Sequence, residues 1–253
     1  MVDAVVLAGS SNDGPLKECS AARFEALIPV GPKIMVEYVV EALLKAGRVR
    51  RVLVVGPSAD LAPLLAGGRV SVVESAGGIM ENIEAGLRLL AGERRVLLVT
   101  SDIPMLTPRA VDNFLDLCGD MSGDLYYPII SKSEVEKKYS STRRTYVGLK
   151  DGVFTGGNLF LLNPDVYKKG VENGQKIIQL RKSPLGLCRL LGIGFVVKFL
   201  LRSLTLAEAE RKVSQLLGMI DGVVVVSKYP EVGVDVDKPG DLELAKKNID
   251  LGR

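Results

Sequence analysis

Three short stretches of this 253-residue chain combine the residue types that bind phosphate groups and hard cations. The stretch Leu7–Gly14 (LAGSSNDG) consists of small residues, so its backbone could approach a phosphate closely and offer it several amides. Asp102 and the alternating pair Asp235 and Asp237 supply carboxylates. Mg²⁺ typically takes one or two protein carboxylates and leaves its other positions to phosphates and water. The three stretches therefore predict metal-assisted phosphate chemistry.

Each stretch also has an ordinary structural interpretation. Gly, Ser, Asn and Asp dominate turns, so Leu7–Gly14 could simply end a strand. Asp102 could be a turn residue or could cap a helix that begins near Pro108, and Asp237 could be a turn residue. These roles do not require the two carboxylates to meet. A shared cation does, because its ligands must come within roughly 4–6 Å of one another.

The composition excludes several other kinds of chemistry. The chain has no histidine, which rules out Ser-His-Asp catalysis, histidine-ligated zinc and a histidine general base. Cys19, Cys118 and Cys188 are scattered without CxxC spacing, which argues against a disulfide framework or a zinc knuckle. The net charge of +3 is too small to indicate a nucleic-acid-binding protein.

The elements that must position these residues follow an alternating pattern in the first half of the chain. Short valine-rich runs, apolar throughout, alternate with amphipathic segments, which is typical of βαβ units around a parallel sheet with both faces covered. Ligands of such sheets bind beyond the carboxyl ends of the strands, where Gly9 and Asp102 follow. The predicted strands are Ala4–Leu7, Val52–Val55, Val70–Val73 and Val96–Val99, and the predicted helices are Met35–Ala46, Ala59–Leu65, Ile79–Leu90 and Pro108–Cys118.

The second half is less regular, and we interpret the chain as a single α/β domain over residues 1–253 with an insertion at residues 131–218. The fold class that we predict is a three-layer, mostly parallel sheet with helices on both faces. The further predictions are strands at Asp124–Ile130, Gly157–Leu162 and Gly222–Ser227, a hairpin of Tyr146–Leu149 with Gly152–Thr155, helical segments within Asp165–Leu217 and a closing helix at Gly240–Asn248.

Two stretches bear on membranes and location. Leu185–Leu201 is apolar but too short and too interrupted to span a bilayer. We expect the region Arg181–Arg202 to be largely buried, as a core helix pair broken at Gly192 and Gly194, and not to lie on a membrane. The first residues, VDAVVL, carry an acidic residue and no basic region before the apolar run, which indicates a strand, not a signal peptide, and a cytoplasmic protein.

Four motifs occur in the order found in the NTP transferase family. They are VVLAGS near the start, TSDIPMLTP after the fourth strand, TGGNLFLLNP in mid-chain and VGVDVDKPGDL near the end. The chain resembles the branch that contains molybdopterin guanylyltransferases and sugar-phosphate nucleotidylyltransferases, and the resemblance covers nearly its whole length. It implies a glycosyltransferase-A-type fold and a reaction that moves a nucleotidyl group from an NTP to a phosphorylated small-molecule acceptor with release of pyrophosphate.

The resemblance also implies roles for individual residues. It makes Asp102 and Asp237 catalytic ligands of Mg²⁺, and it places residues 131–218 on the acceptor side. Arg143 and Arg181 could clamp an acceptor phosphate, although solvated surface charge is the alternative for both. The nucleotide residues are Leu7, Ala8, Gly9, Ser10, Gly77, Gly78, Glu81 and Asn82, and the acceptor residues are Thr155, Gly156, Gly157 and Asn158.

One position departs from the family pattern. Glu25 stands where the family has a lysine that neutralises phosphate charge, and a carboxylate there would repel phosphate. Lys17 is our candidate catalytic substitute, with Arg23 and Lys33 as alternatives. Three functions stay open: a catalytic nucleotidyltransferase, a non-catalytic nucleotide or sugar-nucleotide binding protein, and a metal-dependent glycosyltransferase that uses the DxD-like segment Asp235–Asp237. The first two fit the LAGS loop better. No nucleic-acid partner is expected, and homodimer formation stays open.

Overall fold

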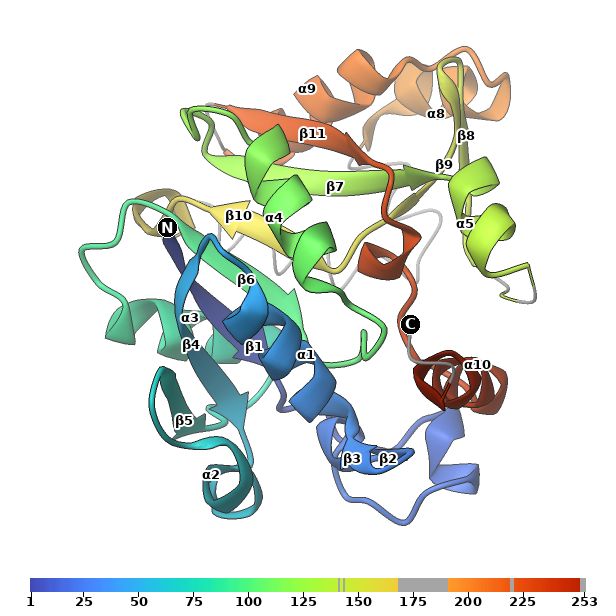
Figure 1. The fold of residues 1–253 in the computed structure, drawn as a ribbon. Helices are drawn as coiled ribbons and strands as arrows, with labels where there is room; N and C mark the ends of the chain where they lie inside the picture. The colour runs from blue at the N-terminus through green and yellow to red at the C-terminus, as the bar shows by residue number, and fades with distance from the viewer. Residues whose placement is uncertain (141, 143, 168–190, 219–220, 251–253) are drawn as a thin grey trace.

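The centre of the molecule is a nine-stranded sheet with the strand order β5-β4-β1-β6-β10-β7-β9-β8, in which β11 also pairs with β7 (Figure 1). The computed structural model describes residues 1–140, 142, 144–167, 191–218 and 221–250. Among the described strands only β9 and β10 run against the others. The strands are β1 (Val2–Leu7), β4 (Val49–Gly56), β5 (Val70–Glu74), β6 (Val96–Thr100), β7 (Leu125–Ser131), β8 (Val147–Leu149), β9 (Gly152–Gly156), β10 (Leu159–Leu162) and β11 (Gly222–Ser227), and β2 (Pro29–Val30) pairs with β3 (Lys33–Ile34) in a separate small sheet.

The register of the parallel strands decides where their loops emerge. Leu7 lies opposite both Val55 and Thr100, and Gly56 lies opposite Glu74. The carboxyl ends of β1, β4, β5 and β6 therefore lie at one edge of the sheet. The loops that follow β1, β5 and β6 leave from this edge, as the sequence predicts for a ligand site.

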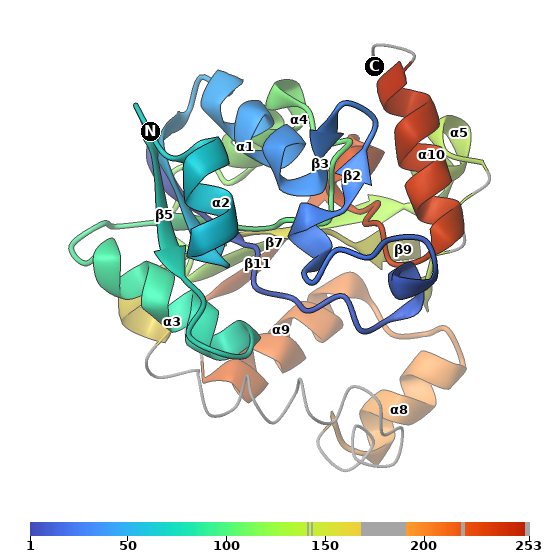
Figure 2. The same ribbon diagram turned by 90° about the horizontal axis from the view of Figure 1, so that it is seen from below.

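Helices cover both faces of the sheet, so the predicted α/β fold with a mostly parallel sheet is confirmed. Figure 2 shows α1 and α4 on one side of the sheet and α3 with α9 on the other. Each face has its own hydrophobic core, because successive strand residues point to opposite faces: Val6 packs in one core and Val5 in the other. The helices are α1 (Met35–Lys45), α2 (Ser58–Leu65), α3 (Ile79–Leu89), α4 (Pro108–Leu117), α5 (Lys132–Lys138), α8 (Ile193–Leu200), α9 (Leu206–Leu217) and α10 (Pro239–Asp250), with 3-10 turns η1 (Pro15–Glu18), η2 (Glu25–Leu27) and η3 (Pro230–Val232).

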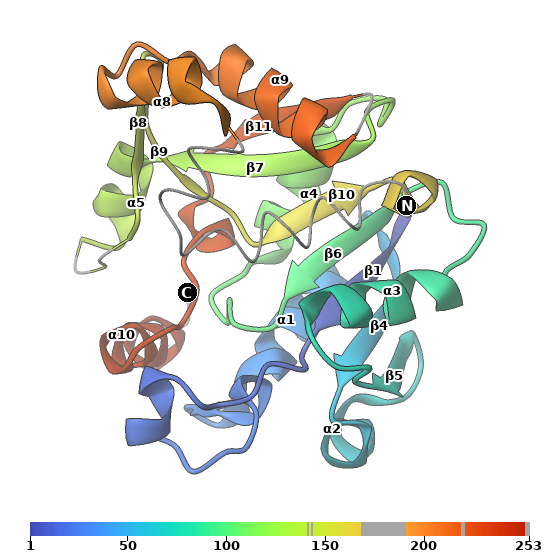
Figure 3. The same ribbon diagram turned by 180° about the vertical axis from the view of Figure 1, so that it is seen from behind.

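The expectation of a buried core helix pair within Arg181–Arg202 is wrong for the part that the structure describes. Helix α8 has no buried residue, and Ile193 and Leu201 are 82% and 73% exposed. Ile193, Val197, Phe199 and Leu200 of α8 are exposed, and the helix lies at the periphery, beside α9 in the view from behind (Figure 3). Residues 181–190 lie outside the described residues. Within the described residues, no helix combines the length and the apolar character needed to cross a bilayer.

Candidate functional site

The loop after β1 is held rigidly at the carboxyl edge of the sheet. The backbone N–H of Ala8 donates to the carbonyl of Val55 over 2.8 Å, which extends the pairing of β1 with β4. The buried side chain of Asn12 donates to the carbonyls of Ser20 and Ala22, at 3.0 and 2.9 Å. These bonds fold residues 10–14 back onto residues 20–25.

Asn82 organises the loop after β5 and lies close against Gly9 of the loop after β1. Its side-chain oxygen accepts from the Ser75 hydroxyl at 3.0 Å and from the Ala76 N–H at 2.7 Å, and its amide donates to the carbonyl of Gly77 at 3.2 Å. A Cβ on Gly9 would lie 2.6 Å from the Asn82 amide nitrogen, so only glycine allows this approach. The structure thus brings Gly9 and Asn82 together with the Gly77 loop.

The remaining predicted nucleotide residues belong to the same two loops. Leu7, Ala8 and Ser10 flank Gly9 in the loop after β1. Gly78 is the N-cap of α3, and the carboxylate of Glu81 lies over it, 2.8 Å from where a Cβ would be. All eight predicted residues therefore lie at this edge of the sheet. Their contact with a nucleotide stays a prediction.

Three carboxylates converge next to these loops. Oxygen atoms of Asp102, Asp235 and Asp237 all lie within 4.8 Å of one another. Asp102 follows β6, and its carboxylate accepts a hydrogen bond from the Thr100 hydroxyl at 2.5 Å. The Val236 N–H donates to the carbonyl of Asp102 at 2.8 Å, which fixes the segment Asp235–Asp237 against the end of β6. The turn and cap roles considered above would not produce this convergence.

The charges of the three aspartates oppose one another. Burial raises the pKa of Asp102, and the neighbouring charge of Asp237 adds to this. Burial also raises the pKa of Asp235, as does the charge of Asp102, while Arg144 acts in the opposite direction. A divalent cation would remove this repulsion, and carboxylate oxygens are the ligands that Mg²⁺ prefers. The geometry and the donor set therefore fit a hard cation.

Arg144 is the cationic neighbour of this cluster. Its guanidinium forms an ion pair with the Asp235 carboxylate and also donates to the Asp235 carbonyl. The Arg144 side chain is only 7% exposed. It therefore fixes both the backbone and the side chain of Asp235, and it offsets one of the three negative charges.

Glu25 faces the same cluster. Its N–H donates to the Ser10 carbonyl at 3.0 Å, which places it beside the loop after β1. Burial, together with the charges of Asp102, Asp237 and Asp13, raises the pKa of Glu25 from 4.5 to about 7. The side chain at the family lysine position is thus a fourth carboxyl group that approaches the aspartates.

The basic residues considered as substitutes for the family lysine differ in their partners. Lys33 forms an ion pair with Glu41 of α1. The guanidinium of Arg23 lies 5.7 Å from the centre of the Phe24 ring. Lys17 is exposed in η1 and makes no ion pair with the part of the chain that the structure describes. Lys17 therefore stays the candidate that is free to move towards a phosphate.

The TGGN stretch links the aspartate segments to the second half of the sheet. The Asn158 carbonyl accepts from the Thr100 N–H at 3.2 Å, and the Asn158 N–H donates to the Val232 carbonyl at 2.7 Å. A Cβ on Gly157 would lie 2.8 Å from Pro128, so this close approach requires glycine. Buried Thr155 precedes it in β9. The predicted acceptor residues thus lie beside the end of β6, whereas Arg143 and Arg181 lie outside the described residues.

A buried ion pair anchors the chain that leads into the aspartate segment. Glu231 is 1% exposed and pairs with Lys138 of α5 at 2.8 Å. Its second oxygen accepts from the Thr107 hydroxyl at 2.9 Å. Thr107 also caps α4. The network ties α4, α5 and η3 together just before Asp235, so the positions of the carboxylates depend on contacts far apart in sequence.

The predicted metal ligands were Asp102 and Asp237, and the structure adds three neighbours to them: Asp235, Glu25 and Arg144. Asp235 was recognisable from its alternation with Asp237, which puts both side chains on one face of an extended segment. Glu25 stood out only as a departure from the family pattern. Nothing in the sequence pairs Arg144 with Asp235, because the contact arises from tertiary folding alone.

An open sheet with carboxylates and a glycine-containing loop at its carboxyl edge defines the class of α/β nucleotide-binding domains. The family pattern described as the MobA-like NTP transferase domain matches residues 4–149. The chain belongs to this family. No curated protein matches the chain.

Solved structures share the fold over nearly the whole chain. A hypothetical transferase from Thermus thermophilus is 39% identical with a TM-score of 0.83, and the alignment covers 95% of this chain and 99% of that one. A CMP:2-keto-3-deoxy-manno-octonic acid synthetase complexed with CTP is 16% identical with a TM-score of 0.61, covering 100% and 99%. A 4-diphosphocytidyl-2C-methyl-D-erythritol synthase from Anaerococcus prevotii is 10% identical with a TM-score of 0.59, covering 99% and 96%. The last two show likeness of fold alone.

Proposed function

We propose that the protein is a Mg²⁺-dependent nucleotidyltransferase that moves a nucleoside monophosphate from an NTP to a phosphorylated small molecule. The observation that carries this proposal is the convergence of Asp102, Asp235 and Asp237 within 4.8 Å, beside the loop of Gly9. Membership of the NTP transferase family supports the reaction type. A CMP:2-keto-3-deoxy-manno-octonic acid synthetase complexed with CTP and a 4-diphosphocytidyl-2C-methyl-D-erythritol synthase share the fold.

The proposed reaction is a displacement at the α-phosphorus. An oxygen of the acceptor phosphate forms a bond to the α-phosphorus of the NTP, and the bond from that phosphorus to the bridging oxygen breaks, so that pyrophosphate leaves with the electron pair. Asp102, Asp235 and Asp237 would hold the cation, which neutralises phosphate charge when it is bound. Catalysis in such transfers consists mainly of positioning and electrostatic stabilisation.

The chain's own residues would position the two substrates. The amides of the Gly9 loop and the N-terminus of α3 would receive the nucleotide, with Asn82 holding the loop that leads from β5 into α3. Lys17 would place a positive charge near the leaving pyrophosphate. Strands β8 and β9, with Asn158 beside Thr100, would form the acceptor side.

A second function rests on Glu25. A carboxyl group beside the aspartates adds negative charge where the family has a lysine. A protein that binds a nucleotide or sugar nucleotide without turning it over is the alternative that this charge favours.

A panel of the four NTPs with phosphorylated sugars, polyols and alcohols tests the proposal by pyrophosphate release. We expect release with at least one NTP, dependent on both acceptor and Mg²⁺. Binding of an NTP without release for any acceptor would favour the non-catalytic alternative. Transfer of sugar from a sugar nucleotide without pyrophosphate release would overturn the proposal in favour of a glycosyltransferase.

A further inference from the structure

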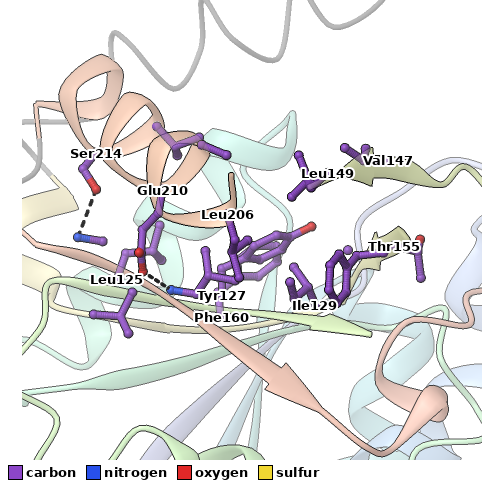
Figure 4. Close-up of a pocket in the computed structure, with 17 residues that line it drawn as sticks. Leu125, Tyr127, Ile129, Val147, Leu149, Thr155, Phe160, Leu206, Glu210 and Ser214 are labelled. Atoms are coloured by element: carbon purple, nitrogen blue, oxygen red, sulfur yellow. Dashed lines mark hydrogen bonds between the residues drawn. The ribbon is translucent and has the colours of Figure 1, made fainter. Parts of the chain in front are cut away.

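A pocket of about 500 Å³ lies between the second half of the sheet and helix α9 (Figure 4). Its floor is formed by the residues of β7 that point away from the main core, namely Leu125, Tyr127 and Ile129. The Tyr127 ring stacks on Phe160 of β10, with ring centres 5.4 Å apart. Val147 of β8 and Ala209 of α9 contribute to the walls.

The lining of the pocket is almost entirely apolar. The carboxylate of Glu210 accepts from the Val224 N–H at 2.6 Å, and the hydroxyl of Ser214 accepts from the Gly222 N–H at 3.2 Å, so each of these groups already has a partner in the protein. The Tyr127 hydroxyl differs, because it has no hydrogen-bond partner among the described residues. A ligand that fits this lining is apolar along most of its length and carries a hydrogen-bonding group at one end.

That end of the pocket adjoins the candidate transfer site. The Tyr127 hydroxyl lies directly over Gly156, where a Cβ would come within 1.6 Å of it. Gly156 and Thr155 line the pocket and are followed by Gly157 and Asn158. Asn158 in turn bonds to Thr100, whose hydroxyl donates to Asp102. The TGGN stretch is therefore the shared wall between the pocket and the aspartate cluster.

We propose that this pocket holds the hydrocarbon part of the acceptor, so that the substrate is a monophosphate ester with an alkyl or isoprenoid body. This inference rests on the proposed function. The phosphate would lie at the TGGN end, near the aspartates, with the chain extending along β7 beneath α9. A cavity of this size is within the range of small-molecule sites, and among the described residues its lining offers the hydroxyls of a sugar few partners besides the Tyr127 and Thr155 hydroxyls.

The proposal sets a quantitative expectation for chain length. Each methylene moved from water into an apolar site contributes enough to lower Kd about fourfold. A homologous series of n-alkyl monophosphates of about four to ten carbons should therefore bind progressively more tightly to the full-length protein. Kd is measured by calorimetry without NTP, and KM for pyrophosphate release is measured separately with NTP and Mg²⁺.

Two variants of α9 test whether the dependence of Kd on chain length arises in this pocket. Ala209 lines the pocket, whereas Ala207 on the same helix is exposed and does not. Ala209→Phe should fill the pocket and abolish the dependence of Kd on chain length, and Ala207→Phe should keep it.

Equal Kd for short and long alkyl chains in the wild-type protein would overturn the proposal. So would an Ala209→Phe variant in which Kd still depends on chain length as it does in the wild type. The two readouts separate this proposal from the reaction itself. Pyrophosphate release with sugar phosphates, but no chain-length effect, would overturn the apolar acceptor and leave the transferase intact. A chain-length effect without release for any NTP would overturn the transferase, and with it the acceptor role of the pocket.

Discussion

At the level of single residues, the candidate site brings together four carboxyl groups, of Asp102, Asp235, Asp237 and Glu25, and few cationic side chains. Arg144 offsets the charge of Asp235, whereas the charges of Asp102 and Asp237 raise the pKa of Glu25, and the charge of Asp237 raises the pKa of Asp102. Such a concentration of like charge is costly unless a ligand or a bound proton relieves it. We therefore expect the stability of the protein to depend on both pH and divalent cations.

Glu25→Gln tests the pH dependence. The pKa of Glu25 is raised from 4.5 to about 7 in the folded chain, so the folded state binds this proton more tightly than the unfolded state. Its contribution to stability is present below the unfolded pKa and is lost as the pH rises through the folded pKa. Without a divalent cation, Tm should fall between about pH 5 and pH 8, and this fall should be smaller in Glu25→Gln.

The matched control for this experiment is Glu18→Gln, because Glu18 is exposed in the neighbouring 3-10 turn. This variant should keep the full pH dependence. An identical fall of Tm in Glu25→Gln and the wild-type protein would show that the aspartates do not raise the pKa of Glu25.

Lys17→Ala tests the basic residue that replaces the family lysine. Because Lys17 is exposed and makes no ion pair with the described residues, its loss should leave Tm unchanged. Removing a charge contact of the transition state should lower kcat by about 10²–10³-fold. Lys33→Ala is the comparison variant for kcat, because the Lys33 side chain already forms an ion pair with Glu41. An unaffected rate in Lys17→Ala would remove Lys17 from the mechanism and direct attention to Arg23 and Lys33.

The sequence predicted individual site residues where a strand end carried them. Asp102 and Gly9 follow apolar runs directly, and Asp237 sits in a distinctive motif, so their position at a common edge could be expected from the sequence alone. Arg144 and the role of Glu231 could not, because both depend on which loops meet in three dimensions. Side-chain pairs of this kind leave no periodic signal in the chain.

At the scale of elements, glycines decide how β9 and β10 lie along β7. Gly156 pairs opposite Ile129, and the Tyr127 hydroxyl occupies the space where its side chain would be. The strand breaks at Gly157 and Asn158 and then resumes as β10 between β7 and β6. This break is what turns the TGGN stretch towards the end of β6.

Gly156→Ala tests the close packing of β9 on β7. The new Cβ would lie 1.6 Å from the Tyr127 hydroxyl oxygen, so the Tyr127 ring or one of the strands must shift. Overpacking of this kind typically costs about 1–3 kcal/mol of unfolding free energy. Tyr127→Phe in the same chain should recover part of the loss, because it removes the nearest atom.

Urea denaturation measures both changes, and Gly194→Ala is the matched control. Gly194 lies in α8 with nothing within 4 Å of a Cβ, so alanine there should not destabilise the protein. Equal stability of Gly156→Ala and the unchanged protein would contradict the packing described for β9.

Some helices and strands could be predicted from sequence patterns, and others could not. The buried valine-rich strands and the amphipathic helices of the first half could be predicted because their periods are distinct. Helix α5 was missed because it is short and charged, and it begins only where Ser131 caps it, accepting from the Glu134 N–H at 3.3 Å. The burial of α8 was predicted wrongly, because apolar composition does not reveal whether another element covers a helix.

At the scale of the whole molecule, two halves of the chain complete one site. The first half supplies β1, β6 and the loops after them, and the last part of the chain supplies Asp235 and Asp237 next to α10. The buried contacts of Glu231 and the bond from Val236 to Asp102 join these parts. The family pattern matches residues 4–149, whereas the aspartate cluster also needs Asp235 and Asp237, so the cluster is a property of the complete fold.

The most direct test of the account is calorimetric binding of the preferred NTP in Mg²⁺ and in EDTA. The unchanged protein should bind in Mg²⁺ and lose affinity in EDTA. Asp102→Asn and Asp237→Asn should each weaken binding in Mg²⁺ by at least about tenfold with Tm no lower than before, because each removes a ligand charge and relieves repulsion. Asp116→Asn, on the exposed surface of α4, should bind as the unchanged protein does. Equal affinity in Mg²⁺ and EDTA, with no loss in either site variant, would contradict the metal-dependent transferase.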